Sequence, residues 1–234
     1  MKIINEITEH DRSMFDKIDR DCLAMHVLPP PKTFIKLEVH DQYGEKQLEY
    51  NLRSRSWVRN AYNVLGTNFL FLADNNGGAT YGAGYLNVKK TDGNIANLGS
   101  ILQTASNLSR SVGGSGITAQ GIVVGTGTGA ESFEDYKLGT LIANGSGAGQ
   151  IAYAAQSATT RAYDAGTKKM TAVGSRVFNN NSGGQISVSE VAWCTDCYSS
   201  TYIMLCRDLL ASAVAVENAA QLTVTYTIEL TFPA

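Results

Sequence analysis

The chain has 234 residues and a formal net charge of −2, so it carries no basic excess for binding nucleic acid or an acidic membrane. Its length allows one large β domain or two small ones, and no apolar run approaches the ~20 residues that span a bilayer. Only 17% of the residues are charged, and half of the charges lie in the first 60 residues. We therefore expect a charged N-terminal part and a weakly charged body, whose surface is either covered by neighbours or simply polar.

Residues 1–33 are expected to form an arm attached to the main body. The start is acidic and amphipathic and lacks the apolar core of a signal peptide, so we expect no secretion by that route. Apolar residues recur there at the spacing of short helical turns, and the three prolines that follow favour an extended segment. A mobile tail is the alternative. The residues expected to contact a neighbouring subunit are Ile3, Ile4, Ile7, Phe15, Ile18, Pro29, Pro30 and Pro31.

The next segment, residues 34–73, is expected to form a hairpin and a helix. Residues 34–40 alternate strictly between apolar and polar, residues 47–52 do so more loosely, and a glycine-containing turn separates them. Ser54 or Ser56 is then expected to cap a helix that runs to about residue 71. Its apolar stripe, expected to be core, comprises Trp57, Val58, Ala61, Tyr62, Leu65 and Phe69. The nearby arginines, Arg53, Arg55 and Arg59, either lie in solvent or meet an acidic neighbour or a phosphate.

The remainder of the chain indicates a β-rich body. A loop-rich insertion over residues 74–116, with short strands around residues 81–89, precedes a strand at 117–124. Two β-prone runs, 171–178 and 185–193, flank an Asn/Gly-rich turn and predict a second hairpin, with a bulge where the alternation slips at Glu190–Val191. Residues 222–230 show the clearest alternation and are expected to share one domain with that hairpin.

Together these patterns predict a mainly β protein. We expect an antiparallel β-sandwich or jelly-roll-like body over residues 34–234, with its core in residues 117–234, one amphipathic helix and an extended N-terminal arm.

One stretch imitates a dinucleotide-binding motif. Gly125-Thr126-Gly127-Thr128-Gly129-Ala130 follows the strand at 117–124 in the order G-x-G-x-x-A. The expected short helix after it opens with Glu131, Glu134 and Asp135, which would repel a pyrophosphate. We therefore expect a flexible glycine loop, and no cofactor.

Candidate catalytic and metal-binding residues are sparse. His10, His26 and His40 all precede the main β region. A nucleophile in the β region would therefore need a histidine base from the arm or the first hairpin. Cys194 and Cys197 form one C-x-x-C pair, whereas a structural zinc site usually has two. Free thiols are the simplest expectation; a disulfide from Cys197 to Cys194, or across a turn to Cys206, is the alternative, with Cys22 far away. We expect no enzyme activity and no metal.

Several motifs resemble a group of structural proteins of tailed bacteriophages. These are RSRSWVRN at 53–60, ESFEDYKLGTL at 131–141, NNSGGQIS at 180–187 followed by SEV at 189–191, LCRDL at 205–209 and LTVTYTI at 222–228. The resemblance covers roughly residues 34–70 and 117–232. It implies a tail, neck or capsid-decorating component that is assembled in the host cytoplasm and located in the virion, with copies of itself and other virion proteins as partners.

A fibre or adhesin module that binds a host-surface glycan is the alternative function. Aromatic residues between glycine-rich loops are typical of such modules, and the candidates are Tyr81, Tyr85, Tyr153 and Tyr163. Buried strand aromatics are the other explanation for these tyrosines.

Overall fold

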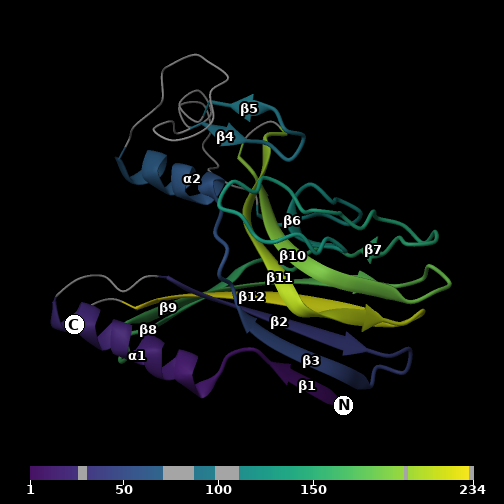
Figure 1. Cartoon of the computed structure of the whole chain (residues 1–234), viewed down its shortest axis with the longest axis horizontal. Helices are drawn as coiled ribbons and strands as arrows, with labels where there is room; N and C mark the ends of the chain where they lie inside the picture. Colours follow the sequence, from purple (N-terminus) through teal and green to yellow (C-terminus); the bar gives the residue numbers. More distant parts are fainter. Residues whose placement is uncertain (26–30, 71–86, 98–110, 198–199, 232–234) are drawn as a thin grey trace.

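The structure is a computed structural model that describes residues 1–25, 31–70, 87–97, 111–197 and 200–231. It is mainly β, as predicted (Figure 1). The elements in chain order are β1 (Lys2–Asn5), α1 (Glu9–Ala24), β2 (Lys32–His40), β3 (Lys46–Arg53), α2 (Arg59–Leu70), β4 (Val88–Lys89), β5 (Ile95–Ala96), β6 (Gly121–Gly125), β7 (Ala152–Tyr153), β8 (Thr160–Asp164), β9 (Lys169–Asn179), β10 (Ile186–Asp196), β11 (Tyr202–Val216) and β12 (Gln221–Thr231).

The larger sheet has seven strands in the order β1-β3-β2-β12-β9-β7, with β8 also paired to β9. Its pairs are antiparallel apart from β1 and β3, which run parallel. The alternation that predicted β12 is confirmed, because Leu222, Val224 and Tyr226 are fully buried. Ile228 on the same face is partly buried against the core. This strand therefore lies in the middle of the sheet with one apolar face inward.

The smaller sheet, in the order β11-β10-β6, shares one hydrophobic core with the larger sheet. Val188 and Val191 of β10 lie in the same buried cluster as Leu37 of β2 and Val224 of β12. The pairing of β10 with β11 shifts register between Val188 and Glu190, so the predicted bulge is present, one residue earlier than the slip in the sequence. The bulge lets Glu190, Val191 and Ala192 all be buried.

The predicted hairpin over residues 171–193 is wrong. Its strands, β9 and β10, belong to different sheets, so the Asn/Gly-rich turn crosses from one sheet to the other. Asn180 fixes this crossing, because its side-chain amide donates to the carbonyls of Gly184 at 2.8 Å and Val216 at 2.7 Å. A hairpin and a crossing both need turn residues between alternating strands, so the local pattern does not separate them.

The first predicted hairpin is confirmed. Strand β2 pairs with β3 over Phe34–Arg53. Asp41 shapes its turn by accepting the N–H groups of Tyr43 and Glu45, while Gly44 has φ +83°, which suits glycine.

The predicted helix caps and much of the predicted stripe of α2 are wrong. The helix begins at Arg59, and the hydroxyls of Ser54 and Ser56 donate to carboxylates elsewhere in the fold. Tyr62 and Leu65 are exposed. Val58 and Ala61 are buried as expected. Trp57 is only partly buried, and its backbone forms an isolated antiparallel β-bridge with Cys206. The Phe69 side chain lies outside the described residues.

Buried asparagines take the place of the missing apolar residues on α2. Asn60 exchanges hydrogen bonds with the backbone of Lys89, and Asn63 donates to the carbonyl of Asn87 at 2.7 Å. The inner face of the helix therefore binds the edge of β4, and only part of it packs into a core. Of the predicted insertion at 74–116, residues 87–97 and 111–116 are described, and the short strand candidate survives as β4.

The N-terminal segment does not extend away from the body. Residues Lys2–Asn5 pair with Leu48–Asn51 of the chain's own β3, and α1 follows along the same margin of the larger sheet (Figure 1). The predicted single helix thus becomes two. The expectation of an extended arm is wrong at β1, because a parallel strand satisfies the backbone groups of β3 that an arm would leave open.

Candidate assembly surface

The predicted assembly residues divide between the two sides of the N-terminal segment. Ile3 and Ile18 remain 59% and 37% exposed. Ile4 packs against the core, and Ile7 and Phe15 are partly buried, so these three serve the chain's own fold. Pro31 is exposed, and Pro29 and Pro30 lie outside the described residues.

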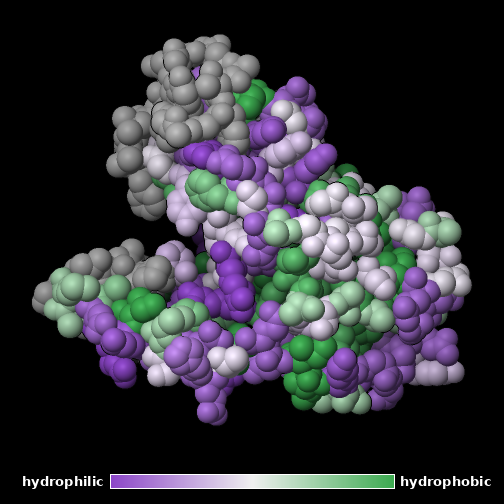
Figure 2. Space-filling view, viewed as in Figure 1, coloured by the Kyte–Doolittle hydropathy of each residue, from purple (hydrophilic) through white to green (hydrophobic). Residues whose placement is uncertain are grey.

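One side of α1 carries an apolar stripe, and Met14 in this stripe lines a cleft between α1 and α2. Met14 and Ile18 are one helical turn apart, and Met25, just beyond the end of the helix, lies near the same line; all three are exposed. Figure 2 shows hydrophobic residues at the surface along α1 and over β1. Met14 and Met25 were missed as assembly residues in the sequence, although the same spacing that singled out Ile18 contains both.

The side of α1 that faces the body binds the outer face of the sheet through an aromatic ring and an ion pair. The guanidinium of Arg53 lies 3.2 Å from the ring centre of Phe15, and Lys32 pairs with Asp19. The helix begins with a reciprocal cap, in which Thr8 and Asp11 each accept the other's backbone N–H, at 3.1 and 2.9 Å. Since successive residues are roughly 100° apart around a helix, Met14 and Ile18 lie beside this contact, and the side opposite it carries Lys17 and Arg20.

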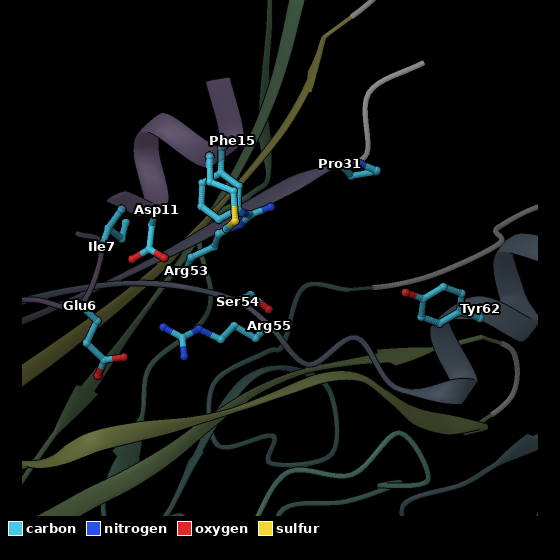
Figure 3. Close-up of a pocket in the computed structure, with 10 residues that line it drawn as sticks. Glu6, Ile7, Asp11, Phe15, Pro31, Arg53, Ser54, Arg55 and Tyr62 are labelled. Atoms are coloured by element: carbon cyan, nitrogen blue, oxygen red, sulfur yellow. The ribbon is translucent and has the colours of Figure 1, made fainter. Parts of the chain in front are cut away.

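A cleft of about 390 Å³ separates this segment from α2 (Figure 3). Arg53 and Arg55 from the end of β3 lie on its floor, Phe15 and Asp11 on one side and Tyr62 on the other. The predicted arginine cluster is thus split. Arg59 does not line the cleft with Arg53 and Arg55 and forms a forked hydrogen bond with Glu134. Arg55 forms no salt bridge to another described residue.

The open edge of β11 is sealed by side chains. The N–H of Leu209 donates to Glu131 at 2.6 Å and that of Ala211 donates to Glu6 at 3.1 Å. The Arg207 N–H on the same edge donates to the carbonyl of Ser56, in the segment between β3 and α2, at 3.1 Å. This edge therefore has few backbone groups left for a partner strand.

Asp208 of β11 is a buried carboxylate next to this edge. It is 1% exposed and accepts the Ser54 hydroxyl and the Arg55 N–H, each at 3.0 Å, with the Tyr226 hydroxyl at 3.4 Å. All of these donors are neutral. Burial raises the pKa of Asp208 to about 7, against the opposing effect of these hydrogen bonds.

The glycine segment that was expected to be a flexible loop is a loop, and a buried carboxylate holds it. Glu190 is fully buried and accepts the N–H groups of Gly127 at 2.9 Å and Thr140 at 2.8 Å. A Cβ atom at Gly125 or Gly127 would overlap this carboxylate, so both positions require glycine. The motif thus serves packing around Glu190.

Arg207 neutralises that carboxylate. Its guanidinium donates to Glu190 at 2.7 Å and to Asp135 at 2.8 Å. Burial opposes its charge, but the hydrogen bonds to the two carboxylates outweigh this and raise the pKa of Arg207. The predicted short helix at Glu131, Glu134 and Asp135 is absent, and each of these carboxylates binds a partner in the fold.

A second buried arginine has no counterpart in the sequence predictions. Arg176 is 1% exposed and donates to five backbone carbonyls, those of Gly114, Ile117, Gln120, Ile122 and Ala154, at 2.7–3.1 Å. Burial lowers its pKa to about 10. The loop that precedes β6 is therefore folded around this side chain, and a charged residue in an alternating strand gave no signal of that role.

All four cysteines are free, so neither candidate disulfide is present. Cys194, Cys197 and Cys206 are buried, and burial raises the pKa of Cys194 and of Cys197 to about 12. Within the described residues, no group of three or more His, Cys, Asp or Glu side chains is placed to hold a metal ion.

Of the four tyrosines named for glycan binding, the two that the structure describes differ in exposure. Tyr153 is buried, with its ring against Phe178, whereas Tyr163 is 60% exposed on β8. Tyr81 and Tyr85 lie outside the described residues. A different pair is exposed: Tyr62 and Phe133 meet edge to face, with ring centres 5.5 Å apart.

Neither described helix is both long and apolar enough to cross a membrane. No family model matches the chain, and no curated protein or solved structure was found that matches it.

Proposed function

We propose that the chain is a non-enzymatic virion structural protein of a tailed bacteriophage, which assembles into a homo-oligomeric tail, neck or capsid-decoration component. The observation that carries the proposal is the exposed apolar surface of the N-terminal segment, formed by Met1, Ile3, Met14, Ile18 and Met25. Water opposes the exposure of such side chains, and the occurrence of five of them within the first 25 residues favours a protein partner for this segment. The motif resemblance supports the phage context.

The finer description of the fold is part of the same proposal. Two sheets share one core, and the chain crosses between them after β9 and again after β11. These features favour a β-sandwich or jelly-roll-like body, which suits a subunit that must pack beside copies of itself. The partners would be other copies of the chain and other virion proteins, and the location would be the virion.

Electron microscopy of the purified full chain tests the proposal. We expect rings, tubes or another ordered oligomer, and the double substitution Met14→Glu/Ile18→Glu should reduce them to smaller species. Arg20→Glu, on an exposed position of the same helix, is the matched control and should assemble normally. Monomers from the unsubstituted chain would contradict the proposal.

The deletion of residues 1–28 is a poor substitute for these variants. Glu6 accepts both the buried Tyr50 hydroxyl and the Ala211 N–H, so its removal would leave both donors unpaired. It would also expose the edge of β3. A loss of assembly after deletion would therefore not separate a lost contact from a damaged fold.

A glycan-binding module remains the second candidate, favoured by the exposed Tyr62–Phe133 pair. Arg59 lies over Phe133, 5.0 Å from the ring centre, and its pairing with Glu134 places polar groups beside the aromatic face. Sugars bind to such combinations of aromatic faces and planar polar groups. A glycan screen in which binding disappears on Phe133→Ala would favour this function, and the absence of any binding would remove it.

A further inference from the structure

The edges of the two sheets are not equally protected. The N–H groups along the free edge of β11 bind Glu6, Glu131 and Ser56, as described above. The free edge of β6 is covered too, since the N–H of Thr126 donates to the Thr140 carbonyl and the N–H of Ile142 donates to the Val124 carbonyl. By contrast, no described residue outside β3 forms a backbone hydrogen bond with Lys2–Asn5. An uncovered edge strand is a template for another strand.

The backbone of β1 offers two residues to such a strand. Glu6 donates its N–H to the Asn51 carbonyl of β3. Because the N–H and C=O groups of successive residues in a strand point to opposite sides, Lys2 and Ile4 also face β3, and Ile3 and Asn5 face away from it. The pattern leaves two N–H and two C=O groups on the outer edge, next to the exposed Ile3 side chain.

We propose that β1 pairs with β1 of a second copy of the chain, antiparallel about a twofold axis, so that the larger sheets of two copies become continuous. The inference rests on the proposed self-assembly and specifies its first contact. In the register that opposes Ile3 to Asn5, both outward residues of each copy find a partner. Four backbone hydrogen bonds form, and Ile4 meets Ile4 at the axis.

Charge complementarity selects this register. It places Lys2 opposite Glu6 of the second copy, at both ends of the pairing. Lys2 is exposed and forms no salt bridge to another described residue. The Oε1 atom of Glu6 accepts Tyr50 and Ala211, while Oε2 accepts no hydrogen bond from the described residues. The oxygen left over on Glu6 and the ammonium of Lys2 thus complement each other across the twofold axis.

A cysteine cross-link tests the register directly. Opposed residues that do not exchange hydrogen bonds have Cα atoms ~4.5 Å apart, within the ~4.4–6.8 Å range of disulfides. Ile4→Cys in a Cys22→Ser background should therefore yield a disulfide-linked dimer on mild oxidation. Ile3→Cys is the matched control. Residue 3 of one copy opposes residue 5 of the other, so the two cysteines would be diagonal neighbours ~7–8 Å apart and should remain mostly unlinked.

A proline variant tests the hydrogen bonds. Ile3→Pro removes one outward N–H from each copy while sparing the bonds to β3, and it should give monomers in sedimentation with an unchanged circular dichroism spectrum. Ile3→Val keeps the N–H and should keep the oligomer. Tyr163→Lys, on the exposed strand β8, should also keep it.

The possible failures are distinguishable. If the unsubstituted chain is a monomer at every concentration, both the proposed function and this pairing are wrong. If it assembles but Ile4→Cys does not cross-link and Ile3→Pro still assembles, only the pairing through β1 is wrong. Loss of assembly in Tyr163→Lys alone would move the contact to β8.

Discussion

The buried carboxylate of Asp208 makes a quantitative prediction about stability and pH. Its pKa is raised from 3.8 to about 7 by burial, so the folded chain holds a proton that the unfolded chain releases. The resulting stabilisation is complete below pH 3.8 and is lost as the pH rises through 7. Linkage over this shift gives a loss of about 2.5 kcal/mol in the free energy of unfolding between pH 5 and pH 8.

Asp208→Asn removes the titration and nearly preserves the shape. The carboxamide oxygen can still accept the Arg55 N–H, and its amide can donate to the Ser54 hydroxyl. We expect the variant to show little pH dependence between pH 5 and 8 and to be more stable than the unsubstituted chain at pH 8. The gain in the free energy of unfolding at pH 8 should be about 2 kcal/mol. Removing the buried charge stabilises the variant, and a less favourable hydrogen bond from the carboxamide offsets part of that gain.

Urea unfolding followed by tryptophan fluorescence at pH 5, 6, 7 and 8 measures this difference. Glu131→Gln is the control, since Glu131 is a neighbouring carboxylate that contributes only a small part of the shift. Carboxylates whose pKa is lowered, such as Glu38 and Glu134, lose their contributions only as the pH falls below their ordinary pKa of 4.5, and so they lie outside the window. Equal pH slopes for the variant and the unsubstituted chain would refute the reasoning.

Three further predictions concern the core and the thiols. Val224→Asp should prevent folding, because it buries a carboxylate without a partner. Thr225→Asp, on the opposite face of the strand, should lower the free energy of unfolding by about 1 kcal/mol or less. Similar thermal melting of the two variants would show that the face assignment is wrong. Gly127→Ala should destabilise the chain by about 2 kcal/mol or more through overlap with Glu190, and a melting temperature equal to that of the unsubstituted chain would contradict this. A thiol reagent should modify Cys22 in the folded chain and all four cysteines in urea; reaction of a second cysteine under native conditions would contradict the burial of the other three.

The β character and the β2–β3 hairpin could be predicted from the sequence because they depend on local alternation and turn residues. The partners of β9 and β10 could not, since the turn at 180–185 suits a hairpin and a sheet crossing equally well. That choice depends on the long-range hydrogen bonds of Asn180 to Gly184 and Val216. Sequence spacing carries no information about which sheet a strand joins.

The assembly surface was also predicted only in part. Helical spacing identified Ile18 but did not show which side of α1 faces the body, because the inner side is held by charged residues. Arg53 and Phe15 decide that orientation, together with the pairing of Lys32 and Asp19. The buried arginines, Arg176 and Arg207, were missed because a charged residue in a strand ordinarily indicates a solvated face, and their partners come from distant loops.

Sedimentation velocity of the full chain over a hundredfold range of concentration tests the central claim most directly. If the chain assembles through its N-terminal segment, species heavier than the 25.1 kDa monomer should dominate at the higher concentrations. Met14→Glu/Ile18→Glu should reduce their size with the fold intact. A single 25.1 kDa species of the unsubstituted chain throughout the range would contradict the account.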